Sequence, residues 1–143
     1  MGSWGTESCS NDPCHDALSR FCSDIHEMSQ AEADKTLGYV FTSAFKKDYG
    51  ECCFQSRLGV IIWILSHGLH IKKSYLIRGL GYAKTMLADK AYLNRWVDDA
   101  ERKTALQKEI KDIQYAMKND GRAPARKIEG LMSKITSLLG KVT

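Results

Sequence analysis

The residues whose types best suit metal chemistry are cysteines and histidines near the start of the chain. The densest set comprises Cys9, Cys14, His15, Cys22 and His26. In a helix Cys22 and His26 would share a face, which makes Cys9, Cys14, Cys22 and His26 weak candidates for a zinc site. Cys22 also falls on the apolar stripe of its helix, where a free cysteine acts as a small hydrophobe. We therefore expect reduced cysteines, with disulfides as the lesser alternative, and neither a metal nor a cofactor.

Ser66, followed by His67 and His70, suggests a different chemistry, a nucleophile beside a general base. Ser66 has no nucleophile-elbow motif, and the sequence between Glu51 and Asp89 contains no acidic residue that would orient a histidine. A histidine at the end of a helix is also stabilised by the exposed carbonyl groups there. We therefore predict no catalytic residues and no enzyme, and a small hydrolase is the least favoured alternative.

A third group combines positive charge with tyrosine rings. Its members are Lys72, Lys73, Tyr75, Arg78 and Tyr82. Tyrosine and arginine are the residue types that most often anchor protein interfaces, so these residues are predicted to bind a protein with an acidic surface. Nucleic acid is the alternative partner, although the cations do not form one clean helical stripe. A plain solvated face is the ordinary interpretation of such residues and stays open.

The distribution of charge agrees with a charged partner. The chain of 143 residues carries 21 basic and 17 acidic side chains, a formal net charge of +4. Residues 1–50 contain four basic and eight acidic side chains, whereas residues 51–90 contain six and two. Such a dipolar surface can steer a charged partner, but it lacks the strong basicity of a dedicated nucleic-acid binder.

Helical periodicity predicts an all-α fold, a compact bundle of about six helices around a central buried helix at about 51–67. This segment contains the apolar run 58–65 and is apolar around most of its circumference. The run is rich in β-branched residues, so a strand is the alternative. No second β-rich segment is available to pair with such a strand. The run is also too short to span a membrane.

Capping residues predict where the other helices begin. Asp12-Pro13 opens a helix over 13–28, and Ser29 with Glu32 forms a capping box that opens a second helix carrying the stripe Leu37, Val40, Phe41, Ala44 and Phe45. Ser74 is expected to cap a helix over 74–88, with inward residues Leu76, Ile77, Leu80, Ala83, Met86 and Leu87. A further stretch begins near residue 90 and breaks at 98–99, before a last helix that carries Leu106, Ile110, Ile113 and Met117.

The chain is expected to divide into three parts. Residues 1–118 form a helical domain, whose start is anchored by Trp4 between two glycines, and residues 119–125 form a linker. Residues 126–143 form an amphipathic basic helix, with the apolar residues Ile128, Leu131, Met132, Ile135, Leu138, Leu139 and Val142. It must dock on its own domain, on a partner protein or symmetry mate, or on an anionic membrane surface.

The opening Met1-Gly2-Ser3-Trp4-Gly5-Thr6, followed by Asn11-Asp12 and Asp16, resembles the start of an uncharacterised family of small bacterial and phage-associated proteins, whose chains begin MGxWGxGxFxND. The stretch 76–117 is similar to that family's ending through Leu80, Ala83, Met86, Leu87, Leu93, Trp96, Asp98, Asp99, Ile110 and Ile113. The resemblance covers residues 1 to about 118. It departs at residues 7–10, where the family has Gly-x-Phe, and near residue 105, where a Trp is absent.

The resemblance implies a small helical domain with no established catalytic residues, suspected in some settings of belonging to toxin-immunity or inter-element conflict systems. Together with the charge pattern, it predicts a non-enzymatic protein-interaction module that inhibits or neutralises a partner protein, as an immunity or anti-defence factor would. Nucleic-acid binding through the basic middle and tail is the alternative function, and a homo-oligomer through the C-terminal helix at 126–143 is a further expectation. The start lacks the features of a secretory signal, so a cytoplasmic location is expected.

Overall fold

The computed structural model describes residues 8, 12–49, 53–96 and 99–123. The regular structure of these residues is helical, without a strand, so the predicted all-α fold is confirmed and the strand alternative for 58–65 is wrong. The elements are α1 (Asp12–Ser19), the 3₁₀ turn η1 (Ile25–Glu27), α2 (Gln30–Val40), α3 (Ser43–Tyr49), α4 (Cys53–Ser66), α5 (Lys73–Ala88), α6 (Lys90–Leu93) and α7 (Asp99–Lys118). None of these helices is long and apolar enough to cross a membrane, among the residues described.

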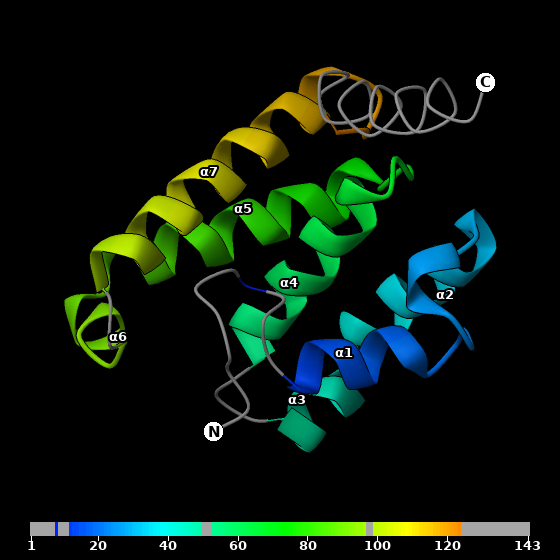
Figure 1. The fold of residues 1–143 in the computed structure, drawn as a ribbon, viewed down its shortest axis with the longest axis horizontal. Coiled ribbons are helices and arrows are strands. Elements are labelled where there is room, and N and C mark those ends of the chain that lie inside the picture. The colour runs from blue at the N-terminus through cyan, green and yellow to red at the C-terminus, as the bar shows by residue number, and fades with distance from the viewer. Residues whose placement is uncertain (1–7, 9–11, 50–52, 97–98, 124–143) are drawn as a thin grey trace, which may run out of the picture.

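Helix α4 is the central element, as its sequence predicts. It packs against α1, α2 and α3 on one side and against α5 and α7 on the other (Figure 1). Its fully buried side chains include Leu58, Val60, Ile61 and Ile64. A helix that is apolar around its circumference is stable only when other helices cover every face, which explains its position.

The two longest helices, α5 and α7, lie side by side and run antiparallel (Figure 1). Gly79 of α5 permits the close approach of α4, because a Cβ atom there would lie 2.5 Å from Cδ1 of Ile61. The same Cβ would lie 3.7 Å from Cδ1 of Ile113 on α7. Gly79 is therefore the point at which α4, α5 and α7 meet most closely.

The first two helices differ from the sequence prediction. The helix expected over 13–28 ends at Ser19, and the chain forms a short 3₁₀ turn at 25–27. The Asp24 side chain accepts a hydrogen bond from the backbone N–H of His26 at 2.9 Å, a local bond that competes with a continuous helix. The Ser29–Glu32 capping box is present as predicted, but the helix it opens ends at Val40 and α3 follows as a separate helix. Ala44, expected on the apolar stripe, is exposed.

Helix α5 corrects two further expectations. It begins at Lys73, with Lys72 as its N-cap and no side-chain capping bond, so Ser74 is not the cap. Leu76, Ala83 and Met86 are buried as predicted, whereas Leu80 and Leu87 are half-buried. Ile77 was expected to point inward, but it is 52% exposed, the highest value among the large apolar side chains that the structure describes.

The chain turns sharply after α7. Asp120 and Gly121 both have positive φ, at 58° and 69°. The carbonyl of Gly121 accepts a hydrogen bond from the N–H of Ile71 at 2.9 Å, and Nη1 of Arg122 donates to the carbonyl of Gly68 at 2.9 Å. The first part of the predicted linker is thus a packed turn, fastened to the α4–α5 connection. The anchoring of Trp4 and the docking of 126–143 concern residues outside the described part of the chain.

A polar network inside the domain connects α7 to the start of the chain. Oγ of Ser8 donates to Oε1 of Glu109 at 2.7 Å, and Nη2 of Arg102 donates to Oγ of Ser8 at 3.0 Å. Arg102 and Glu109 also form an ion pair at 3.5 Å, and Arg102 donates to the hydroxyl of Tyr92. All four residues are at least half-buried, so the network is part of the core.

Candidate functional site

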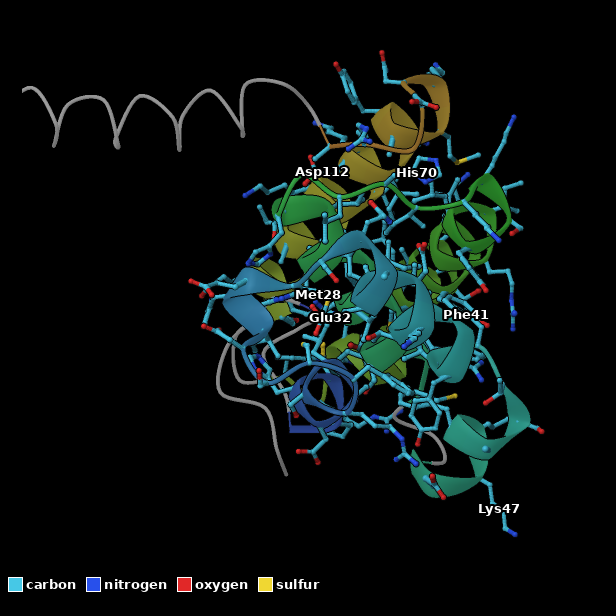
Figure 2. All side chains as sticks on the ribbon, turned by 90° about the vertical axis from the view of Figure 1, so that its right-hand side faces the viewer. Met28, Glu32, Phe41, Lys47, His70 and Asp112 are labelled. Carbon is cyan, nitrogen blue, oxygen red and sulfur yellow. The ribbon has the colours of Figure 1, made fainter. Side chains whose placement is uncertain are left out.

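Four aromatic rings from three helices form a column on one flank of α5. Phe41 and Tyr75 stack with their centroids 4.9 Å apart and their planes at 28°, and Phe54 and Tyr82 stack at 4.6 Å and 21°. Phe41 and Tyr82 are near-parallel at 6.2 Å and 16°, so they join the two pairs. In Figure 2 Phe41 lies toward the right-hand edge of the molecule, at the end of α2. We call these rings, together with Arg57 and Arg78, the Tyr82 cluster.

The local structure of α5 explains half of this cluster. Tyr75, Arg78 and Tyr82 are three and four residues apart, so they lie on one face of the helix. Phe41 occupies the C-cap of α2, where the chain turns toward α3, and Phe54 lies in the first turn of α4. Phe54 is 39% exposed, while the other three rings are half-buried. The cluster is therefore an accessible surface with fixed side chains.

Two arginines converge on the hydroxyl of Tyr82. Nη1 of Arg57 donates to this oxygen at 3.1 Å, and Nη2 of Arg78 donates to it at 3.2 Å. Arg57 is buried and also donates to the carbonyls of Val40 at 2.9 Å and Thr42 at 3.3 Å. Arg78 is exposed, and its guanidinium carbon lies 4.6 Å from the centre of the Phe41 ring.

The positive charge of the Tyr82 cluster is not neutralised by an acidic side chain in the part of the chain that the structure describes. The ion pair found there joins Arg102 to Glu109 and involves neither Arg57 nor Arg78. Arg57 is instead stabilised by carbonyl oxygens at the C-terminal end of α2, where the helix dipole favours a cation. The cluster can therefore attract an anionic group from outside the chain.

The five predicted partner-binding residues divide between two flanks of α5. Tyr75, Arg78 and Tyr82 belong to the Tyr82 cluster. Lys72 and Lys73 are exposed at the start of the helix, and Lys73 lines a hollow beside α7. Sequence reasoning missed Phe41, Phe54 and Arg57. The available signal was Arg57, which directly precedes the apolar run 58–65. An arginine buried there requires several hydrogen-bond acceptors from neighbouring elements.

Opposite charges gather at opposite sides of the molecule. Residues 12–40, which contain α1, η1 and α2, carry six acidic and two basic side chains. Residues 72–96, which contain α5 and α6, carry six basic and one acidic side chain. Figure 1 shows α1 and α2 on one side of α4 and α5 on the other. The charge asymmetry of the sequence is thus an asymmetry of the fold, with the Tyr82 cluster in the basic part.

The predicted zinc candidates are not assembled in the residues described. His26 packs against Trp63 with ring centroids 5.2 Å apart, and the Cys22 thiol donates to the carbonyl of Leu18 at 3.0 Å. Cys14 is buried and disulfide-bonded, which corrects the expectation of reduced cysteines at that position. Cys9 lies outside the described residues. No group of three or more His, Cys, Asp or Glu side chains in the described ranges is placed to hold a metal ion.

The free cysteines Cys22 and Cys53 are both buried. Burial raises the pKa of the Cys22 thiol, and the nearby carboxylates of Glu32 and Asp24 raise it further. Cys22 is therefore a protonated core thiol at neutral pH. A thiol in this state is a poor nucleophile and a poor metal ligand.

Ser66 and His67 lie close together without forming an activated pair. Oγ of Ser66 is 3.3 Å from Nδ1 of His67, but the same Oγ donates to the carbonyl of Trp63 at 2.7 Å. Nδ1 of His67 is 2.8 Å from that carbonyl too, and because a carbonyl only accepts, Nδ1 must carry the proton. Nδ1 therefore cannot accept the proton of Ser66. The backbone N–H of His70 donates to Oε1 of Gln30 at 2.9 Å, in a different contact.

Three of the candidate histidines surround one tryptophan instead. The rings of His15, His26 and His67 lie with centroids 5.4, 5.2 and 4.8 Å from Trp63. Nε1 of Trp63 donates to the carbonyl of Ile25 at 3.1 Å and fixes the indole. These histidines therefore serve packing between α1, η1 and α4.

Comparison of the chain with protein-family models, with curated proteins and with solved structures finds no match. The resemblance of the first 118 residues to a family of small bacterial and phage-associated proteins stays a prediction.

Proposed function

We propose that this protein is a non-enzymatic interaction module that inhibits or neutralises a partner protein with an acidic surface, and that the Tyr82 cluster is its binding surface. The observation that carries the proposal is the convergence of Arg57 and Arg78 on the Tyr82 hydroxyl between stacked rings. Arginine and tyrosine are the side chains that most often dominate the free energy of binding at interfaces. The cluster presents both types, together with positive charge that no acidic side chain in the described ranges neutralises.

Preorganisation supports a binding role for this surface. Arg57 is held by three hydrogen-bond acceptors, and Tyr82 is fixed between the guanidinium groups and Phe54. Side chains that are already ordered lose little conformational entropy when a partner binds. The basic surroundings of the cluster would also accelerate the encounter with an acidic protein.

The inhibitory part of the proposal is supported by chemistry and by the sequence resemblance. Nδ1 of His67 holds its proton toward the carbonyl of Trp63, so it is not placed to act as a base for Ser66. A domain that acts without chemistry acts by covering a surface of its partner. The resemblance to proteins suspected of immunity roles points to the same mode of action.

Nucleic acid remains the alternative partner, and the arrangement of the rings disfavours it. The faces of Phe41, Tyr75, Phe54 and Tyr82 that stack on each other are unavailable for stacking on bases. Lys73 and Arg78 also lie on different flanks of α5. Phosphate binding requires cations that converge on one backbone path.

The test is affinity enrichment from native lysate with the wild-type chain, Arg78→Glu and Lys108→Glu. Lys108 is an exposed residue of α7, so the control makes the same charge change away from the Tyr82 cluster. We expect a stoichiometric protein partner that Arg78→Glu loses and Lys108→Glu retains. The purified complex should weaken as salt increases, and the partner's own activity should fall when it is bound. Enrichment that is equal for both variants, or salt-dependent recovery of nucleic acid in place of a protein, would overturn the proposal.

A further inference from the structure

The flank of α5 opposite the Tyr82 cluster contains an open hollow against α7. It is lined by Lys73, Leu80, Gln114, Met117 and Lys118. Ile77 lies between Lys73 and Leu80 on the same face of α5, and it is 52% exposed. The two helices thus border a groove in which the apolar side chains of Leu80 and Met117 lie among two lysines and a glutamine.

This groove has the features of a surface that packs against another helix. Ile77 and Leu80 are three residues apart on α5, and Ile110 and Met117 are seven residues apart on α7. Leu80 and Met117 are half-buried, so each contributes part of its surface to the core and part to the groove. Two such stripes on adjacent antiparallel helices complete a three-helix arrangement when a third apolar face covers them.

We propose that the groove between α5 and α7 is the docking site of the chain's own residues 126–142. This stretch carries the seven apolar residues Ile128, Leu131, Met132, Ile135, Leu138, Leu139 and Val142 at helical spacing. An apolar stripe of that size is rarely left in water. The groove is lined by Leu80 and Met117, and Ile77, the most exposed large apolar side chain that the structure describes, lies on the same face of α5 as Leu80.

The path of the chain after α7 brings this stretch to the groove. Ala123 is buried, and Gly121 and Arg122 are fastened to the α4–α5 connection, next to the start of α5. Lys73, Met117 and Lys118 line the groove at this same end. A short connection between two helices favours an antiparallel return, so residues 126–142 would run back along α7.

The lengths of the two surfaces also agree. A helix of the 17 residues 126–142 would be about 25 Å long at 1.5 Å per residue, and α5 has 16 residues. The short tether raises the effective concentration of the stretch to the millimolar range, so intramolecular docking is favoured over capture of a second copy. Gly130 and Gly140 weaken the isolated helix, so docking and helix formation should occur together.

Charge distinguishes this contact from the Tyr82 cluster. The groove has Lys73 and Lys118 at its rim, and the tail carries Lys127, Lys134 and Lys141 on the face away from its apolar stripe. Since like charges oppose the contact, apolar burial must drive it. Docking should therefore persist or strengthen as salt increases, whereas binding of an acidic partner should weaken.

The experiment is hydrogen–deuterium exchange on the full-length chain, at a concentration where light scattering gives a monomer. Wild type should protect the amides of 126–142, at low and high salt alike. Ile77→Lys places a further positive charge beside Lys73 and should reduce that protection about tenfold or more, because a buried cation among like charges is costly. Thr85→Lys, at an exposed position on another face of α5, is the matched control and should leave it unchanged. Amides of α4 report in each variant that the domain is folded.

A second pair of variants tests the tail itself. Leu131→Glu should remove the protection of 126–142, and Ser133→Glu, on its polar face, should retain it. Tail amides that exchange freely in the wild-type chain would overturn the proposal, as would protection that disappears on dilution together with loss of a dimer. Arg78→Glu should not alter the protection of 126–142. The docking of the tail is therefore tested independently of the binding role proposed for the Tyr82 cluster.

Discussion

Arg57 and Arg102 are both buried, and they keep their positive charges by different means. Arg102 pairs with the carboxylate of Glu109 and bonds to Ser8 and Tyr92. Arg57 bonds to two backbone carbonyls and to the hydroxyl of Tyr82. The first arrangement neutralises the charge inside the domain, and the second holds it close to the surface beside Arg78. The difference separates a group that stabilises the fold from a group that is available to a partner.

The largest effect should follow from breaking the Arg102–Glu109 pair. Glu109→Leu removes the carboxylate that pairs with the buried guanidinium of Arg102 and that accepts the hydrogen bond of Ser8. Loss of one member of a buried ion pair costs about 3–5 kcal/mol of unfolding free energy. Urea unfolding followed by circular dichroism measures the loss. The double variant Arg102→Met with Glu109→Leu should recover most of it, and a single variant with the wild-type midpoint would contradict this account.

Removal of Arg57 should have a smaller effect. Arg57→Met keeps the aliphatic length but leaves the carbonyls of Val40 and Thr42 without their donor. An unpaired buried polar group costs about 1–3 kcal/mol of unfolding free energy. Arg57→Met leaves no buried carboxylate without its partner, so the larger penalty for a broken ion pair does not apply. The same urea titration should therefore rank Arg57→Met between wild type and Glu109→Leu. A loss as large as that of Glu109→Leu would mean that the two arginines play equivalent structural roles.

Tyr82→Phe sharpens the comparison further, since it removes the acceptor that Arg57 and Arg78 share while keeping the stacked ring. We expect a loss of about 0.5–1.5 kcal/mol of unfolding free energy, the usual net contribution of such hydrogen bonds. Tyr75→Phe is the matched control, because it changes a ring of the same column without touching that oxygen. Thermal unfolding of both variants measures the difference. Equal melting temperatures would show that the shared hydroxyl does not contribute to stability.

The smallest effect on stability is expected for Arg78→Glu. Exposed substitutions usually change the unfolding free energy by no more than about 0.5 kcal/mol. Its effect on binding should be much larger, on the order of 2 kcal/mol or about thirtyfold in Kd, if Arg78 is an interface anchor. Calorimetric titration of the purified partner measures the second quantity, with Lys108→Glu beside it. A variant that is unstable but binds normally would reverse the roles assigned to the two arginines.

Local signals predicted the parts of the fold that depend on neighbouring residues. The Ser29–Glu32 capping box and the apolar circumference of α4 were both readable from adjacent positions. The inward assignment of Ile77 failed, because a helix stripe shows which residues are apolar and not which neighbour covers them. The same limit applies to the helix expected over 13–28, where the Asp24 side chain competes with the backbone.

The candidate site was predictable only along one helix. Tyr75, Arg78 and Tyr82 could be grouped by their spacing on α5. Their contacts with Phe41 and Arg57 depend on how α2 and α4 pack, and no local pattern encodes that packing. The buried pair Arg102–Glu109 was missed for a related reason, since charged residues on a helix usually indicate a solvated face. Ser8, which donates to Glu109 and accepts from Arg102, is about a hundred positions away from both in the sequence.

That long separation has a consequence for how the domain folds. The hydrogen bonds between Ser8 and Glu109 join residues 101 positions apart, so they close a loop of nearly the whole described chain. Contacts of such high sequence separation form slowly, because the entropy of loop closure is lost before the bond contributes. During synthesis the start of the chain must wait until α7 has left the ribosome before Ser8 can meet Glu109. The bundle of α1 to α5 can therefore assemble first, and the closing of this loop is expected to be the step that completes the native state.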